Sequence, residues 1–216
     1  MVTSLFAIAG LAVAANAPGG AFTVNPDAGN DTMSAVFDAP LGERIDAVSS
    51  AVGCQLAFRP DGRSVVGRCS VPLTSIQVDS EPTKTEHFEQ WATHQDMEPS
   101  ACTLEAEIVS AKLSGPLAAG QPVPFSAKVR FTICKRPRAD GGLEDLRGTA
   151  LLFPAGSYGK DTTVRLRGAI AGFDREAYGV SPKDTPGWLA RVQMLAPVVA
   201  AKGDVELNLF AKQAAH

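Results

Sequence analysis

The sequence has few of the features that mark an enzyme or a nucleic-acid-binding protein. Its 216 residues include only 3 His, and 20 Lys and Arg stand against 23 Asp and Glu, a formal net charge of −3. Because there is no excess of positive charge to neutralise phosphates, nucleic acid is not expected as a partner. The sequence also lacks a phosphate-binding glycine loop and a dinucleotide-binding fingerprint. Beyond the N-terminal segment it has no apolar run of about 18 residues, so no membrane-spanning helix is expected in the mature chain.

The remaining composition is that of a globular protein. Hydrophobic residues make up 45% and charged residues 20% of the chain, which is too little charge for a disordered protein. A chain of this length is long enough to bury a core, and no linker or shift in composition divides it. We therefore expect one domain over residues 18–216.

The first 17 residues contain no charged side chain. An apolar run, Leu5–Ala14, precedes Ala15-Asn16-Ala17, and this order is typical of a secretory signal peptide that ends in an A-x-A cleavage site. The sequence thus predicts a signal peptide over 1–17 and a periplasmic or secreted protein. An N-terminal strand or helix of the fold is the alternative.

The four cysteines have spacings that suit two disulfides. Cys54 and Cys69 flank a turn centred on Asp61-Gly62, and folding the chain there places the two cysteines opposite each other. Cys102 and Cys134 flank a second turn-rich stretch, 114–120, and are expected to pair in the same way. Two disulfides indicate an oxidising compartment. Four buried free thiols in a cytosolic protein are the alternative.

Most of the chain beyond residue 20 alternates apolar and polar residues with a period of two. This pattern indicates antiparallel strands with one buried face and one solvent-exposed face. A long meander of this kind must close or form a sandwich to hide its apolar face, and a barrel of about eight strands has room for one ligand. We expect an all-β, lipocalin-like antiparallel barrel with one short helix. Alternation gives these candidate interior residues: Val129, Phe131, Ile133, Val164, Leu166, Ile170, Val205, Leu207 and Leu209.

The expected helix follows Glu81-Pro82. Thr83 and Glu86 have the spacing of a capping box, which predicts Thr83 as the N-cap. Phe88, Trp91 and Ala92 then share one face, and Phe88 and Trp91 are candidates to cover one opening of the barrel.

Two histidines near this helix are the main candidates for chemistry. His87 and His94, with Glu86 or Asp96, are the one candidate metal-ligating group, but no metal is expected. His87 is expected to form a hydrogen bond with backbone near the helix. An enzyme that uses His87 with Glu86 or Asp96 is an alternative, which predicts that these groups converge in a polar cleft.

The densest basic run is Lys135-Arg136-Pro137-Arg138. It is expected to be the solvated end of a strand leading into the turn at 140–142. A site for an anionic head group or partner is the alternative.

Two segments resemble the YceI-like family of bacterial periplasmic lipid-binding proteins. The segment 174–179, Asp-Arg-Glu-Ala-Tyr-Gly, resembles the family's Asn-Arg-x-x-Phe-Gly signature, and 84–88, Lys-Thr-Glu-His-Phe, resembles its Arg-Asp-x-His-Leu segment. The resemblance covers about residues 20–213. The chain departs from the pattern at Asp174, Tyr178, Lys84-Thr85 and Cys134, so it looks like a divergent member.

The resemblance implies a barrel that encloses a long isoprenoid chain, such as a quinone tail or a polyprenyl lipid, and no catalytic cofactor. The matching motif and helix residues are candidate ligand contacts: His87, Phe88, Trp91, Arg175 and Tyr178. We therefore expect a non-enzymatic protein that binds, sequesters or transports an amphiphilic isoprenoid lipid in the cell envelope, either alone or as a homodimer. A protein–protein interaction module with a filled barrel is the alternative.

Overall fold

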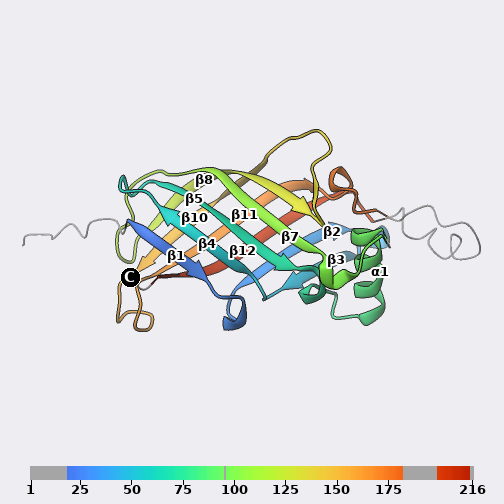
Figure 1. Cartoon of the computed structure of the whole chain (residues 1–216), viewed down its shortest axis with the longest axis horizontal. Helices are drawn as coiled ribbons and strands as arrows, with labels where there is room; N and C mark the ends of the chain where they lie inside the picture. The colour runs from blue at the N-terminus through green and yellow to red at the C-terminus, as the bar shows by residue number, and fades with distance from the viewer. Residues whose placement is uncertain (1–18, 95, 182–198, 215–216) are drawn as a thin grey trace, which may run out of the picture.

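The computed structural model describes residues 19–94, 96–181 and 199–214, which form one antiparallel sheet with a single α-helix (Figure 1). The strands are β1 (Gly20–Val24), β2 (Thr32–Asp38), β3 (Arg44–Ser49), β4 (Gly53–Phe58), β5 (Ser64–Pro72), β6 (Gln77–Val78), β7 (Thr103–Leu113), β8 (Pro122–Ile133), β9 (Arg136–Pro137), β10 (Glu144–Phe153), β11 (Thr163–Asp174) and β12 (Lys202–Gln213). The helix is α1 (Pro82–Thr93), and five short 3₁₀ turns are η1 (Pro26–Ala28), η2 (Pro40–Gly42), η3 (Leu73–Ser75), η4 (Pro99–Ala101) and η5 (Glu176–Tyr178).

The sheet closes into an eight-stranded barrel, as the alternation predicted. The ring runs β1-β4-β5-β7-β8-β10-β11-β12 and is closed by the pairing of β12 with β1, where Lys212 lies opposite Thr23. The same edge of β12 pairs with β1 near its C-terminal end and with β2 over residues 203–208. Strand β2 follows β1 in the chain after η1. Strands β2 and β3 therefore extend the barrel beyond β1 and β4, toward the end that carries α1 (Figure 1).

Both predicted disulfides are present. Cys54 and Cys69 are direct register partners on β4 and β5, and their sulfur atoms are bonded. The hairpin loop between them closes where the Arg59 N–H donates to the Ser64 carbonyl at 2.9 Å. The second disulfide joins Cys102, just before β7, to Cys134, just after β8.

Glycine allows two strands to approach closely on one side of the barrel. Gly148 on β10 and Gly168 on β11 are register partners, and a Cβ atom on Gly148 would lie 1.9 Å from the Arg167 carbonyl oxygen. A side chain at this position is therefore excluded by the neighbouring strand. The register of β10 and β11 continues through these two glycines without a shift.

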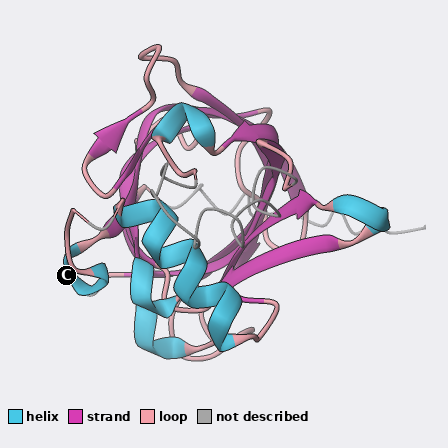
Figure 2. Cartoon of the chain, turned by 90° about the vertical axis from the view of Figure 1, so that its right-hand side faces the viewer, coloured by secondary structure: helices cyan, strands magenta, loops and turns pink. Residues whose placement is uncertain are grey.

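The helix lies across one end of the barrel, over part of its rim (Figure 2). It begins at Pro82 with Glu81 in the N-cap position and no side-chain cap, so the prediction that Thr83 caps the helix was wrong. The reason is that Pro82, which has no N–H and a fixed φ, takes the first helical position and places Thr83 inside the helix. The expected apolar face is present, with Ala92 buried and with Phe88 and Trp91 packed against the core.

Candidate ligand-binding site

The barrel encloses a cavity with apolar walls. Its volume is about 90 Å³, counted as the space that the centre of a water molecule can reach, and one water needs about 10–15 Å³ of such space. Along β5 the walls extend from Val65 to Val71, six residues apart, which corresponds to about 20 Å of strand. The lining residues, of which Ser70 alone has a polar side chain, are Met33, Val52, Leu56, Phe58, Val65, Cys69, Ser70, Val71, Leu104, Ala106, Ile108, Ala111, Leu113, Phe125, Ala127, Val129, Phe131, Leu146, Ala150, Leu166, Gly168, Leu207 and Leu209.

Several side chains that face inward are still partly accessible. Leu166, Leu207 and Phe125 line the cavity and pack against the buried core, yet each is only half-buried. In a filled interior, side chains at such positions are in contact with other atoms on all sides. Their remaining accessible surface is consistent with a hollow centre.

The nine residues predicted for the interior are all on the inner face, but they fall into two groups. Val129, Phe131, Leu166, Leu207 and Leu209 line the cavity. The other four are buried without lining it: Ile133, Val164, Ile170 and Val205. Whether any of the nine contacts a ligand stays a prediction.

Sequence reasoning missed the part of the wall formed by β4, β5 and β7. On β7 the lining residues Leu104, Ala106 and Ile108 alternate with Glu105 and Glu107. The period-two signal was therefore present in the sequence and would have identified this wall.

Arg175 of the family-like motif binds the protein's own backbone. It is 5% exposed, and its guanidinium donates to the carbonyls of Val180 at 2.5 Å, Val199 at 2.9 Å and Ala200 at 3.2 Å. Its charged group also lies 5.5 Å from the ring centre of Trp91 on α1. Burial lowers the pKa of Arg175 from its ordinary value. Arg175 thus joins the end of β11, the chain before β12 and the helix, and it does not line the cavity.

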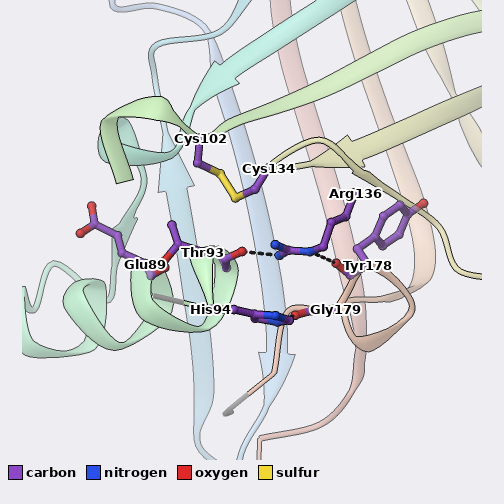
Figure 3. Close-up of a disulfide and its surroundings, with 9 residues drawn as sticks. Glu89, Thr93, His94, Cys102, Cys134, Arg136, Tyr178 and Gly179 are labelled. Atoms are coloured by element: carbon purple, nitrogen blue, oxygen red, sulfur yellow. Dashed lines mark hydrogen bonds between the residues drawn. A yellow bond between two sulfur atoms is a disulfide. The ribbon is translucent and has the colours of Figure 1, made fainter. Parts of the chain in front are cut away.

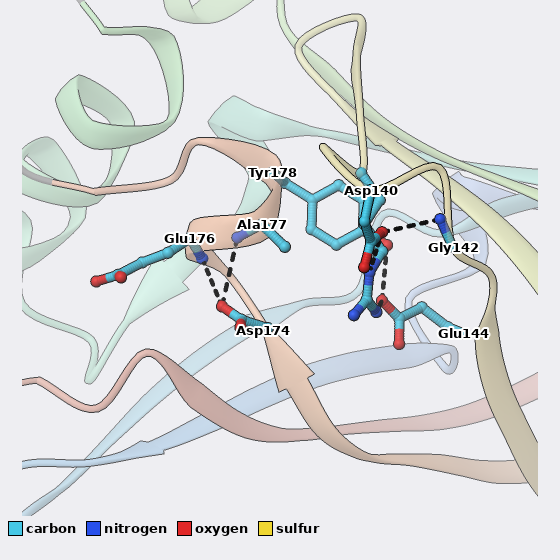
Figure 4. A network of polar contacts seen from close by, with 8 residues as sticks. Asp140, Gly142, Glu144, Asp174, Glu176, Ala177 and Tyr178 are labelled. Carbon is cyan, nitrogen blue, oxygen red and sulfur yellow. Dashed lines mark hydrogen bonds and ion pairs between the residues drawn. The ribbon is translucent and has the colours of Figure 1, made fainter.

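Tyr178 of the same motif packs inside the end of the barrel. Its ring stacks on Phe173 at 5.1 Å, and its hydroxyl donates to the Glu144 carboxylate at 2.7 Å (Figure 4). Arg138 donates to the same carboxylate oxygen, also at 2.7 Å. Burial, together with the hydrogen bond to Glu144, raises the pKa of Tyr178. The departure from Phe to Tyr in the motif is therefore matched by a buried acceptor, and ligand contact by Tyr178 stays a prediction.

The last turn of α1 is tied to the same region (Figure 3). His94 forms a hydrogen bond with the Gly179 carbonyl, and Arg136 donates to the carbonyls of Ala92 and, at 3.1 Å, Tyr178. Close by, the Cys102–Cys134 disulfide joins the start of β7 to the end of β8.

Two expectations about basic and imidazole side chains were wrong. Arg136 and Arg138 are not a solvated strand end, because carbonyl oxygens and the Glu144 carboxylate bind their guanidinium groups. The histidine that bonds backbone next to the helix is His94, whereas His87 is exposed on the helix surface.

The residues proposed for an enzyme or metal site do not form a polar cleft in the described part of the chain. His87, Glu86 and Asp96 are all exposed. Within residues 19–94, 96–181 and 199–214, no three His, Cys, Asp or Glu side chains come close enough to hold a metal ion. These arrangements give the enzyme alternative no support.

Comparison with known proteins finds a match in structure but not in sequence. No protein-family model and no curated protein matches the chain. The structure of a polyisoprenoid-binding domain from Saccharophagus degradans, implicated in plant cell wall breakdown, matches with a TM-score of 0.61 and 9% sequence identity. The match covers 91% of this chain and 100% of that chain. It establishes the barrel fold. At this identity, membership of the YceI-like family stays a hypothesis.

No helix among the described residues is both long and apolar enough to cross a bilayer. The predicted signal peptide, residues 1–17, lies outside the described residues.

Proposed function

We propose that this protein binds one long apolar lipid chain of the isoprenoid class inside its barrel and sequesters or transports it in the cell envelope, without catalysis. The observation that carries the proposal is the cavity, whose walls are apolar except for Ser70. An elongated space of this kind fits a hydrocarbon chain, since it offers hydrogen bonds to almost no polar group.

Burial of the chain alone supplies enough binding energy. Burial contributes about 0.8 kcal/mol per methylene-sized group, so one five-carbon isoprene unit contributes about 4 kcal/mol to the binding free energy before any cost is subtracted. A few units therefore approach realistic affinities even after the cost of immobilising the chain. A protein of this function needs a shaped interior and no recognition of a polar head group within it.

Two further observations support the proposal. The structural neighbour is described as a polyisoprenoid-binding domain, and its whole length matches this chain. The two disulfides fit a protein of an oxidising compartment such as the periplasm. We keep the homodimer as a prediction.

The cavity also favours this proposal over an interaction module with a filled barrel. Such a module predicts an interior packed to normal density, whereas the described strands enclose open space at their centre.

Native mass spectrometry of the protein purified from its own host tests the proposal. We expect a mass above that of the oxidised polypeptide, with the excess lost after extraction with organic solvent and identified in the extract as an isoprenoid. The extracted protein should regain that excess mass when it is incubated with a polyprenol in detergent. A mass equal to the bare polypeptide in all preparations, together with no uptake of polyprenol, contradicts the proposal.

A further inference from the structure

The outer wall formed by β10, β11 and β12 carries a cluster of aromatic side chains. Tyr158, in the loop between β10 and β11, is 44% exposed and stacks on Phe210 of β12 at 5.3 Å. Its ring also contacts Phe153 at the end of β10, at 5.5 Å. In Figure 1 this loop projects at the lower left, beside the C-terminal end of β12. The cluster lies near the end of the barrel opposite to α1.

Basic side chains surround this cluster. The strand register places Leu151, Arg165 and Phe210 in one row across the wall, and Arg167 lies in the next row. Away from the α1 end of this wall, where Lys202 begins β12, the basic residues of the three strands and their loop are Arg147, Lys160, Arg165, Arg167 and Lys212. We call these five residues, with Phe153, Tyr158 and Phe210, the basic aromatic face.

The acidic residues near this face are fewer. Asp161 lies in the same loop, Asp31 is buried beside Phe210, and Glu206 lies in the same row as Arg147. The other acidic side chains that these strands expose lie closer to α1: Asp145, Asp174 and Asp204. The whole chain has a net charge of −3, so the positive charge of this face runs against the overall balance. An anionic partner is therefore attracted to this wall in preference to the rest of the surface.

The arrangement of the rings indicates what kind of anion is favoured. Arg165 lies over the Phe210 ring at 5.1 Å, while its Nε donates to Asn208 at 2.9 Å. Tyr158 stacks on the same ring of Phe210. A single-stranded nucleic acid binds by stacking its bases on open ring faces, and these contacts leave Phe210 poorly available for that. At a membrane surface, by contrast, tyrosine side chains lie at the level of the lipid head groups, and anionic head groups attract Lys and Arg.

We propose that the basic aromatic face docks the protein on a bilayer that contains anionic lipids, with Tyr158 at the head-group level and the five basic side chains over the lipid phosphates. Each basic residue near an anionic surface contributes a factor of about five to binding. The proposal does not depend on the cavity being occupied, because the face is on the outside of the barrel.

Vesicle co-sedimentation tests the docking. The extracted protein is mixed with vesicles of phosphatidylcholine alone or of phosphatidylcholine with about one third phosphatidylglycerol, at low and at high salt. We expect binding to the anionic vesicles only, weakened by salt because the Debye length shortens. Equal binding to both vesicle types, or binding to neither, overturns the proposal.

A matched pair of variants locates the binding surface. Replacing Lys160 and Arg167 by glutamine removes two charges from the face and should lower the partition coefficient about 25-fold. Replacing Lys112 and Arg68 by glutamine removes the same charges from β7 and β5, on the opposite wall, and should change it less than twofold. The replacement Tyr158→Ser should also weaken binding. Equal losses in the two double variants overturn the proposal, as does capture of single-stranded DNA in place of vesicles.

Discussion

Replacement of Ala111 by phenylalanine distinguishes a hollow barrel from a filled one by the sign of the stability change. Ala111 on β7 lines the cavity between Val65 and Ala127, its register partners on β5 and β8. Two adjacent alanines leave space on this row. A phenylalanine ring at position 111 therefore enters the cavity and does not displace a packed neighbour.

The expected size follows from burial. Burying a phenylalanine side chain contributes about 1.5–3 kcal/mol, and loss of side-chain freedom offsets about 1 kcal/mol of this. We expect the lipid-free variant to be more stable by about 0.5–2 kcal/mol, which raises Tm by about 1–8 °C for a protein of this size. In a filled core the same replacement costs about 1–3 kcal/mol through over-packing.

Lipid binding should change in the opposite direction. The ring occupies the space of about one isoprene unit, so a gross loss of about 4 kcal/mol, or three orders of magnitude in Kd, is expected. Calorimetric unfolding of the lipid-free protein and titration with a polyprenol measure the two effects. The control is Ala57→Phe, on the exposed face of β4, which should leave both unchanged. A fall in Tm for Ala111→Phe, with unchanged lipid affinity, refutes the reasoning.

Three further predictions concern stability. Tyr178→Phe removes the hydrogen bond to Glu144 and should lower the free energy of unfolding by about 1.5 kcal/mol in urea titrations, the low end for a charged acceptor; no change would show that the bond contributes nothing. Asp31 is fully buried, and this burial raises the pKa of its carboxyl group. The folded protein therefore loses stability as the pH rises above the ordinary Asp pKa of 3.8, because the carboxyl group ionises more readily in the unfolded chain. Asp31→Asn should therefore be more stable than the natural protein at pH 7, by a margin that shrinks toward pH 4; a margin independent of pH would contradict this. Replacing Cys102 and Cys134 together by alanine opens a loop with a sequence separation of 32 and should cost about 4 kcal/mol by denaturant unfolding, whereas an unchanged midpoint would refute the loop-entropy estimate.

The sequence allowed the fold to be predicted where local rules determine the structure. The turn at Asp61-Gly62 determines the register of β4 and β5, and that register alone places Cys54 opposite Cys69. Alternation likewise determines which face of a strand is buried. It does not determine the position of a residue along the barrel axis, which is why Val164 was grouped with Leu166 although only Leu166 lines the cavity.

The contacts at the α1 end could not be predicted from local patterns. Arg136 bonds backbone carbonyls 42 and 44 residues away, and His94 bonds one 85 residues away. A basic run next to a turn has the same local pattern whether it is solvated or buried. Only the closed barrel, which brings α1, β9 and η5 together, makes these carbonyls available to Arg136 and His94.

The family-like motif and the cavity therefore constrain different properties of the protein. The hydrogen-bonding groups of Arg175 and Tyr178 bind this chain's own carbonyls and carboxylate, so their residue types are required by the geometry of the barrel end. The cavity wall requires only apolar side chains of suitable volume, and many combinations meet that requirement. This difference is compatible with a shared fold at 9% identity. Under the proposed function, we therefore expect small wall residues such as Ala111 and Ala127, and not the motif, to determine the length and width of the lipid that the cavity accepts.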